Sequence, residues 1–144
     1  MKMNIFEGFQ VDFFDALSSL TGCGVLFDVS NAVVAELNGC LGTYAWLTYL
    51  KGKSVHCHMG SYRFNPRTGM YHDTHNESPS PESLELLRLL ADQGSVESLC
   101  YERDYDKTPA NAEDDLSLIA AALGLEEKSG AVLTGDGHEY RRCA

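Results

Sequence analysis

Several features that mark large classes of protein are missing from this sequence. Its 11 Lys and Arg residues are outnumbered by 21 Asp and Glu residues, which gives a formal net charge of -10. Nucleic acids are bound through clustered basic side chains, and the basic residues here are scattered, so we expect no nucleic-acid partner. Glu7, Asp12 and Asp15 interrupt the apolar positions near the N-terminus. This pattern predicts neither a signal peptide nor a membrane span.

The five cysteines also lack the spacing of a disulfide framework or a zinc cage. They are widely separated and odd in number, and no Cys-x-x-Cys pair occurs. Such cysteines are typical of reduced thiols, and we expect a cytoplasmic protein. Cys57 lies between two histidines in an extended segment, so alternation directs its side chain to the opposite face, where we expect it to pack in the core.

What the sequence does contain is an alternation of helix-like and strand-like segments. Apolar residues recur at every third position from Val11 to Leu20 and stop before Gly22, which predicts an amphipathic helix. The short apolar run at residues 24–29 is typical of a parallel strand that is buried on both faces. The same reasoning predicts strands at residues 54–59 and 96–101, and helices at residues 41–50, at residues 81–94, and from a cap at Asn111 to Gly124.

This order of elements predicts an α/β protein with a parallel sheet. Residues 60–82 separate the second strand from the next helix and are rich in Gly, Pro, Asn and Ser. We expect them to form a long polar loop, which in a compact domain is usually functional or mobile.

Residues with metal-binding side chains follow each predicted strand. In parallel α/β folds the reactive residues lie at the C-terminal ends of the strands. Asp28 and Asn31 follow the first strand, His58 closes the second, and Glu102 follows the third. We therefore expect these side chains to converge at one edge of the sheet.

The long loop adds Asp73 and His75, which would point the same way in an extended segment. Imidazole, carboxylate and amide groups together suit Fe(II), Mn(II) or Zn(II), and differ from the thiolate cages of structural zinc. Each residue also has a simpler interpretation. Asp28 could cap a turn, Glu102 could join a surface ion pair with Arg103, and one histidine of the second strand could be a hydrogen-bonded core residue. The coincidence of ligand types at three strand ends favours a shared metal centre.

Four motifs carry a resemblance to a known family. They are Thr-Gly-Cys-Gly-Val-Leu-Phe-Asp-Val-Ser-Asn at residues 21–31, Val-His-Cys-His-Met-Gly at 55–60, Asp-Thr-His at 73–75 and Tyr-Glu-Arg-Asp at 101–104. In this order and spacing they resemble the multinuclear non-heme iron-dependent oxidative enzymes, the family that includes the methanobactin biosynthesis oxidase. The match runs from about residue 12 to residue 123.

The resemblance implies a distorted eight-stranded (β/α) barrel that holds two or three iron ions. It also implies oxidation or rearrangement of cysteine or other residues in a ribosomally made peptide, often alongside a small peptide-binding partner protein. If this chain is active, the resemblance makes it an iron-dependent oxidoreductase that acts on a peptide. The family's ligand motifs fall on Asp28, Asn31, His58, Asp73, His75 and Glu102.

The sequence departs from the family pattern in two ways. A full barrel takes about 250 residues, so we expect a partial TIM-like barrel, truncated or split, in which the N-terminal strands and their His and Glu ligands are missing. Residues 1–124 would be the C-terminal portion of the barrel, and residues 125–144 a weakly ordered tail or a single edge strand. The second departure is Asn76, which stands where the family has an acid.

Unpaired strand edges would favour a homo-oligomer or a companion chain that completes the barrel. Two other functions stay open from the sequence. One is a zinc or manganese hydrolase or isomerase on a similar barrel, because the same ligands serve those metals. The other is a non-catalytic remnant or assembly subunit that binds fewer ions or none.

Overall fold

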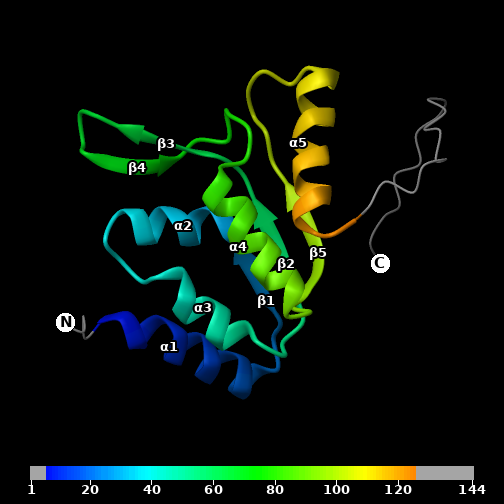
Figure 1. The fold of residues 1–144 in the computed structure, drawn as a ribbon. Coiled ribbons are helices and arrows are strands. Elements are labelled where there is room, and N and C mark those ends of the chain that lie inside the picture. The colour runs from blue at the N-terminus through cyan, green and yellow to red at the C-terminus, as the bar shows by residue number, and fades with distance from the viewer. Residues whose placement is uncertain (1–5, 126–144) are drawn as a thin grey trace.

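Helices and strands alternate along the chain in a computed structural model, which describes residues 6–125, with side chains from residue 10 (Figure 1). The described helices are α1 (Phe6–Thr21), α2 (Val29–Leu37), α3 (Thr43–Leu50), α4 (Pro81–Asp92) and α5 (Pro109–Ala122). The strands are β1 (Val25–Asp28), β2 (Val55–Met59), β3 (Tyr62–Asn65), β4 (Met70–Asp73) and β5 (Val96–Tyr101).

Three strands form a parallel sheet in the order β1-β2-β5, which confirms the predicted α/β class and all three predicted strands. Its register places Asp28 opposite His58. The ladder between β2 and β5 is irregular at one point: Val55 pairs with Val96 and the next residue, His56, pairs with Ser98, so Glu97 is an extra residue in β5. β1 and β5 are the edges of the described sheet.

The core lies between the central strand and the helices on one face of the sheet. Val55, Cys57 and Met59 alternate along β2 and are all buried, as expected for Cys57. Leu87 and Leu90 of α4 have no exposed surface and belong to the same cluster. Burial of each such side chain contributes about 1.5–3 kcal/mol to folding.

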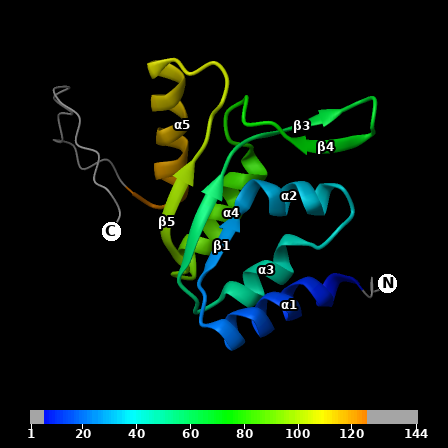
Figure 2. The same ribbon diagram turned by 180° about the vertical axis from the view of Figure 1, so that it is seen from behind.

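The opposite face of the sheet is open, which corrects the prediction that β1 is buried on both faces. Figure 2 shows β1, β2 and β5 in front of α4, with no described helix across them. Leu26 on this face is 73% exposed, whereas Phe27, its neighbour on the other face, is 5% exposed. The apolar run of β1 identified the strand but did not reveal which face is covered.

Helix ends follow the local sequence, but the structure corrects the predicted cap of one helix and contains one helix that was not predicted. Ser80 caps α4 by accepting a hydrogen bond from the Ser83 amide, and Pro81 begins the helix, as predicted. The cap of α5 is Thr108 and not Asn111, because the Thr108 hydroxyl accepts from the Asn111 amide. Helix α2 was not predicted, although Val29, Ala32 and Val33 stand at helical spacing and are buried on one face of it.

Residues 60–82 are not one long loop. Strands β3 and β4 form an antiparallel hairpin that projects from the sheet (Figure 1), with Tyr62 opposite Asp73 and Asn65 opposite Met70. Gly69 makes the connecting turn possible because its φ of 68° is unfavourable for other residues.

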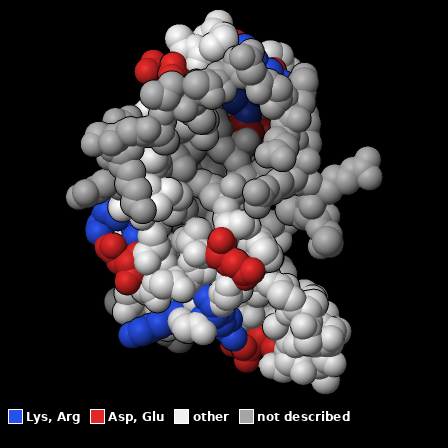
Figure 3. All heavy atoms as spheres, turned by 90° about the vertical axis from the view of Figure 1, so that its right-hand side faces the viewer, with Lys and Arg blue, Asp and Glu red and all other residues white. Residues whose placement is uncertain are grey.

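No described helix is long and apolar enough to cross a membrane. On the face shown in Figure 3, the described Lys and Arg side chains lie among Asp and Glu side chains and not in a patch of one sign. The tail predicted at residues 125–144 lies, beyond Leu125, outside the described residues.

Candidate metal centre

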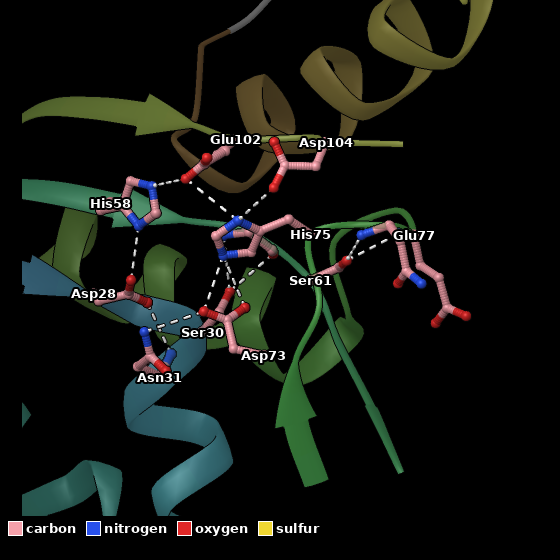
Figure 4. Close-up of polar contacts among 12 residues, drawn as sticks. Asp28, Ser30, Asn31, His58, Ser61, Asp73, His75, Glu77, Glu102 and Asp104 are labelled. Atoms are coloured by element: carbon pink, nitrogen blue, oxygen red, sulfur yellow. Dashed lines mark hydrogen bonds and ion pairs between the residues drawn. The ribbon is translucent and has the colours of Figure 1, made fainter. Parts of the chain in front are cut away.

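The six side chains predicted to bind metal come together at the C-terminal end of the sheet (Figure 4). They arrive from separate elements: the ends of β1, β2 and β4, the first turn of α2, and the segments that follow β4 and β5. Hydrogen bonds and ion pairs connect all of them, directly or through one another: Asp28, Asn31, His58, Asp73, His75 and Glu102.

His58 is held between two carboxylates. Its Nδ1 lies 2.7 Å from Oδ2 of Asp28, and its Nε2 lies 3.0 Å from Oε2 of Glu102. The other oxygen of Asp28 accepts a hydrogen bond from the Asn31 amide and so caps α2. Asp28 is therefore both a helix cap and a partner of the histidine, and the two interpretations of this residue do not exclude each other.

His75 is the second centre of contacts. Its Nε2 lies 2.9 Å from both oxygens of Asp73, and its Nδ1 lies 3.3 Å from Oε2 of Glu102 and 3.6 Å from Oδ2 of Asp104. The Asn31 side chain donates to Oδ2 of Asp73 over 3.4 Å. Glu102 thus joins the two histidines, and the polar groups form one continuous chain.

The backbone at His75 is not extended, contrary to the expectation for Asp73 and His75. Its φ is 49°, in the left-handed region. Ser61 stabilises this turn: its carbonyl accepts from the amides of Thr74 and His75, and its hydroxyl accepts from the next two amides. The turn still brings the Asp73 and His75 side chains together.

Gly60 leaves the space that the imidazole of His75 occupies. A Cβ at this position would lie 2.4 Å from Cδ2 and 2.8 Å from Nε2 of the His75 ring. The buried hydroxyl of Ser30 fixes the Gly60 backbone, since it donates to the Gly60 carbonyl at 2.8 Å and accepts from the Gly60 amide at 3.1 Å. The start of α2 and the end of β2 are thereby locked together beneath the site.

The charges of this cluster favour a bound cation. Four carboxylates face two imidazoles, and Nζ of Lys107 lies 3.9 Å from Oδ1 of Asp104, so two imidazolium ions and this lysine would still leave one negative charge uncompensated. Each histidine has carboxylates at both ring nitrogens, whereas a neutral imidazole carries only one N–H. A divalent cation in place of the missing protons would satisfy these contacts. The donor chemistry of the residues therefore fits a metal ion.

The pKa of His58 is shifted by the same surroundings. Burial by itself would lower the pKa of the imidazole, but the hydrogen bonds and negative charges of Asp28 and Glu102 outweigh burial and raise it above its ordinary value.

Asp104 is a residue of this cluster that the sequence-based prediction missed. One ligand atom each from His75, Glu102 and Asp104 lie within 4.8 Å of one another, a grouping that could hold a metal ion. Alternation after β5 was the available signal, because Asp104 follows Glu102 by two residues. Two other histidines lie apart from the cluster: His56 contacts Ser98, and His72 contacts Thr68.

The fold and the cluster define an α/β protein that gathers histidine and carboxylate side chains where parallel strands end. The sequence model of one family, described as RiPP precursor modification enzyme MbnB/TglH/ChrH, matches residues 4–122. The chain belongs to this family of enzymes that modify precursor peptides, which confirms the resemblance noted in its motifs.

Individual relatives are similar to most of this chain. The chain is similar to the UPF0276 protein of Caulobacter vibrioides, with 35% identity over 131 residues that cover 86% of this chain and 42% of the relative. It is also similar to the UPF0276 protein of Chromobacterium violaceum, with 31% identity over 121 residues, 82% of this chain and 43% of the relative. The chain thus spans less than half the length of these relatives.

Proposed function

We propose that this chain binds iron at the C-terminal end of its sheet and contributes half of the active site of an oxidative peptide-modifying enzyme. The observation that carries the proposal is the continuous chain of alternating carboxylate and imidazole groups from Asp28 to Asp104. The proposed ligands are Asp28, Asn31, His58, Asp73, His75 and Glu102, with Asp104 added from the structure.

Iron at this place would supply redox chemistry and Lewis acidity toward a peptide substrate. The protein's own groups hold its ligands in place. Asp28 orients the His58 ring through Nδ1, and Glu102 lies close to both histidines. Asn31 donates to Asp73, which fixes the carboxylate that faces His75. Such contacts between ligands and their neighbours normally set ring orientation and metal affinity.

The proposal includes a (β/α) barrel of which residues 1–124 form the C-terminal portion. Both edges of the described sheet lie beside apolar grooves that further strands would fill. One groove, of about 220 Å³, lies at β1 and includes Phe14 and Trp46. The other, of about 680 Å³, lies between β5 and α5 and includes Leu99 and Leu116. The open face of the sheet would then face the barrel interior, as in parallel barrels.

We propose that a companion chain or a second copy supplies these strands. The substrate would be a cysteine-containing ribosomal peptide, presented by a peptide-binding partner protein. Family membership supports a peptide substrate, because the matching family modifies peptide precursors. The two unpaired edges support added strands, because exposed edges readily pair with another chain.

The test is elemental analysis after anaerobic purification and iron reconstitution. The double variant His58→Ala/Asp73→Ala removes one of the two histidines and a carboxylate that contacts the other. His56→Ala is the matched control, because this histidine lies two residues away in the same strand and its polar contacts within the described part of the chain are with Ser98 and Glu97. We expect about one or more irons per chain in the wild type and the control, and loss of iron in the double variant.

Other outcomes separate the alternatives. Preferential retention of zinc or manganese would favour a hydrolase or isomerase, because the donor set suits those ions as well. Protein that stays metal-free after reconstitution would contradict the proposal and favour a non-catalytic assembly subunit. Iron-loaded protein would then be tested for oxygen-dependent oxidation of a cysteine-containing peptide, followed by mass spectrometry. Molecular mass in solution, with and without a companion chain, tests barrel completion.

A further inference from the structure

A buried carboxylate lies behind the metal cluster, on helix α5. Asp115 has no exposed surface, and its Oδ2 accepts a hydrogen bond from the Tyr101 hydroxyl at 2.7 Å. The same oxygen accepts from Nη1 of Arg103, whose side chain is 11% exposed. A buried charge of this kind is costly unless a partner of opposite charge compensates it.

The pKa of Asp115 reflects this arrangement. Burial would raise the pKa of the carboxyl, but the hydrogen bonds from Tyr101 and Arg103 and the positive charge of Arg103 outweigh burial and hold it below its ordinary value. Asp115 is thus ionised at neutral pH and forms a true ion pair with Arg103.

The segment that contacts Asp115 also carries two carboxylates of the metal cluster. From Tyr101 to Asp104, successive side chains alternate between two sides. Glu102 and Asp104 approach His75, whereas Tyr101 and Arg103 contact Asp115. The segment therefore joins the cluster to α5.

Two backbone hydrogen bonds tie the same segment to the rest of the site. The Glu102 amide donates to the Met59 carbonyl at 2.9 Å, and the Asp104 amide donates to the His75 carbonyl at 2.7 Å. These bonds limit how far the segment can slide along its neighbours. They do not fix how it is rotated, and this depends on the contacts that Tyr101 and Arg103 make with α5.

We propose that Asp115 is a positioning residue for the candidate metal centre: by holding Tyr101 and Arg103, it fixes Glu102 and Asp104 at His75. The inference rests on the proposed metal site. A role in helix packing alone would be met by an apolar residue, since replacing a buried ion pair with apolar groups is often neutral or stabilising. Two side chains that flank a proposed ligand converge on one carboxylate, and this geometry favours a positioning role.

Asp115→Asn tests the inference because it keeps the shape of the side chain and removes its charge. We expect Fe(II) affinity to fall by about 10-fold to 100-fold, the usual effect of losing a group that orients a ligand. The visible absorption of Co(II)-substituted protein should change as well, because Glu102 and Asp104 would no longer be held. Tyr101→Phe removes the hydroxyl that donates to Asp115, leaves the ion pair with Arg103 intact, and should cause a smaller loss.

The control is Ile119→Val, which trims a buried residue of the same helix. It should lower the free energy of unfolding by about 0.5–1.5 kcal/mol but leave Fe(II) affinity and the Co(II) spectrum unchanged. If Asp115→Asn and Tyr101→Phe bind Fe(II) within about twofold of the wild type with the same Co(II) spectrum, the inference is wrong. It is also wrong if Ile119→Val reproduces their losses.

Hydrogen exchange of the metal-free protein separates this inference from the proposed function. Asp115→Asn should accelerate exchange of the Asp104 amide by about 10-fold or more relative to amides of α4, and Ile119→Val should not. Failure of the wild type to bind metal would refute the proposed function. Faster Asp104 exchange in that case would still show that Asp115 holds this segment, and unchanged exchange would overturn the inference.

Discussion

Replacing Gly60 by alanine should damage the site through one contact. The new Cβ would lie 2.4 Å from Cδ2 of His75, whereas ordinary contacts begin at 3.4 Å. The ring would have to move by about 1.0 Å (3.4 minus 2.4), which is large compared with the tolerance of about 0.2 Å in metal-ligand distances. The glycine itself cannot retreat easily, because Ser30 bonds to both its amide and its carbonyl.

The expected cost is that of an overpacked site, about 1–3 kcal/mol in the free energy of unfolding. Urea unfolding of the metal-free protein, followed by circular dichroism, would measure it. In a His75→Ala background the same change should cost little, because the ring that causes the clash is gone. Such a double-mutant cycle isolates the contact between the two positions.

Gly24→Ala is the matched control, since a Cβ there would meet nothing within 4 Å. It should leave both stability and metal binding close to those of the wild type. Equal costs of Gly60→Ala with and without the His75 ring would refute the reasoning, as would wild-type stability in the single variant.

Three further predictions concern single side chains. Burial raises the pKa of Cys57 to about 11, so only about one Cys57 thiol in a thousand is ionised at pH 8. Mass spectrometry after alkylation of the native protein should therefore find the exposed Cys100 modified and the buried Cys57 intact. Ser30→Ala should lower the free energy of unfolding by about 1–3 kcal/mol in chemical denaturation, because it leaves two buried backbone groups of Gly60 without partners. Burial raises the pKa of Tyr62 to about 12, so its phenol should ionise near pH 12 in an ultraviolet titration of the folded protein. The folded state keeps the Tyr62 proton while the unfolded state loses it near pH 10, so the free energy of unfolding should fall as pH rises from about 10 to 12. Titration of Tyr62 near pH 10 in the folded protein would contradict the reasoning.

The sequence allowed the parallel sheet to be predicted because its strands have distinctive compositions. The alternation of apolar residues and histidines in β2 indicated both its conformation and the face that carries His58. The rule of strand ends predicted that Asp28, Asn31, His58 and Glu102 lie close together, and the motif in the long loop added Asp73 and His75 to them. Helix α4 was equally clear, because Ser80 and Pro81 form a standard helix start.

The features that were missed depend on tertiary contacts. The left-handed backbone of His75 is stabilised by Ser61, which precedes it by 14 residues, and no local pattern indicates such a turn. The hairpin did leave a signal in the apolar residues before Asn65 and after Gly69, but the polar composition of the surrounding segment obscured it. The covered face of β1 could not be predicted, because Leu26 and Phe27 are equally apolar and only their neighbours differ.

The extra residue in β5 has a consequence for how the protein tolerates change in length. Val96 and Leu99 both face the helices although they are three positions apart, where a regular strand would have two, and Glu97 is the extra residue. Removing either Glu97 or Ser98 would leave a regular strand in which Val96 and the residues from Leu99 onward keep their pairs, and Glu102 would keep its direction. Removing Cys100 would instead turn Glu102 toward α5, or, if the irregularity straightened, would put Ser98 in the place of Leu99 against the core. Residues 97 and 98 are thus the positions where this strand can be shortened without turning the ligands away from the histidines or displacing Leu99.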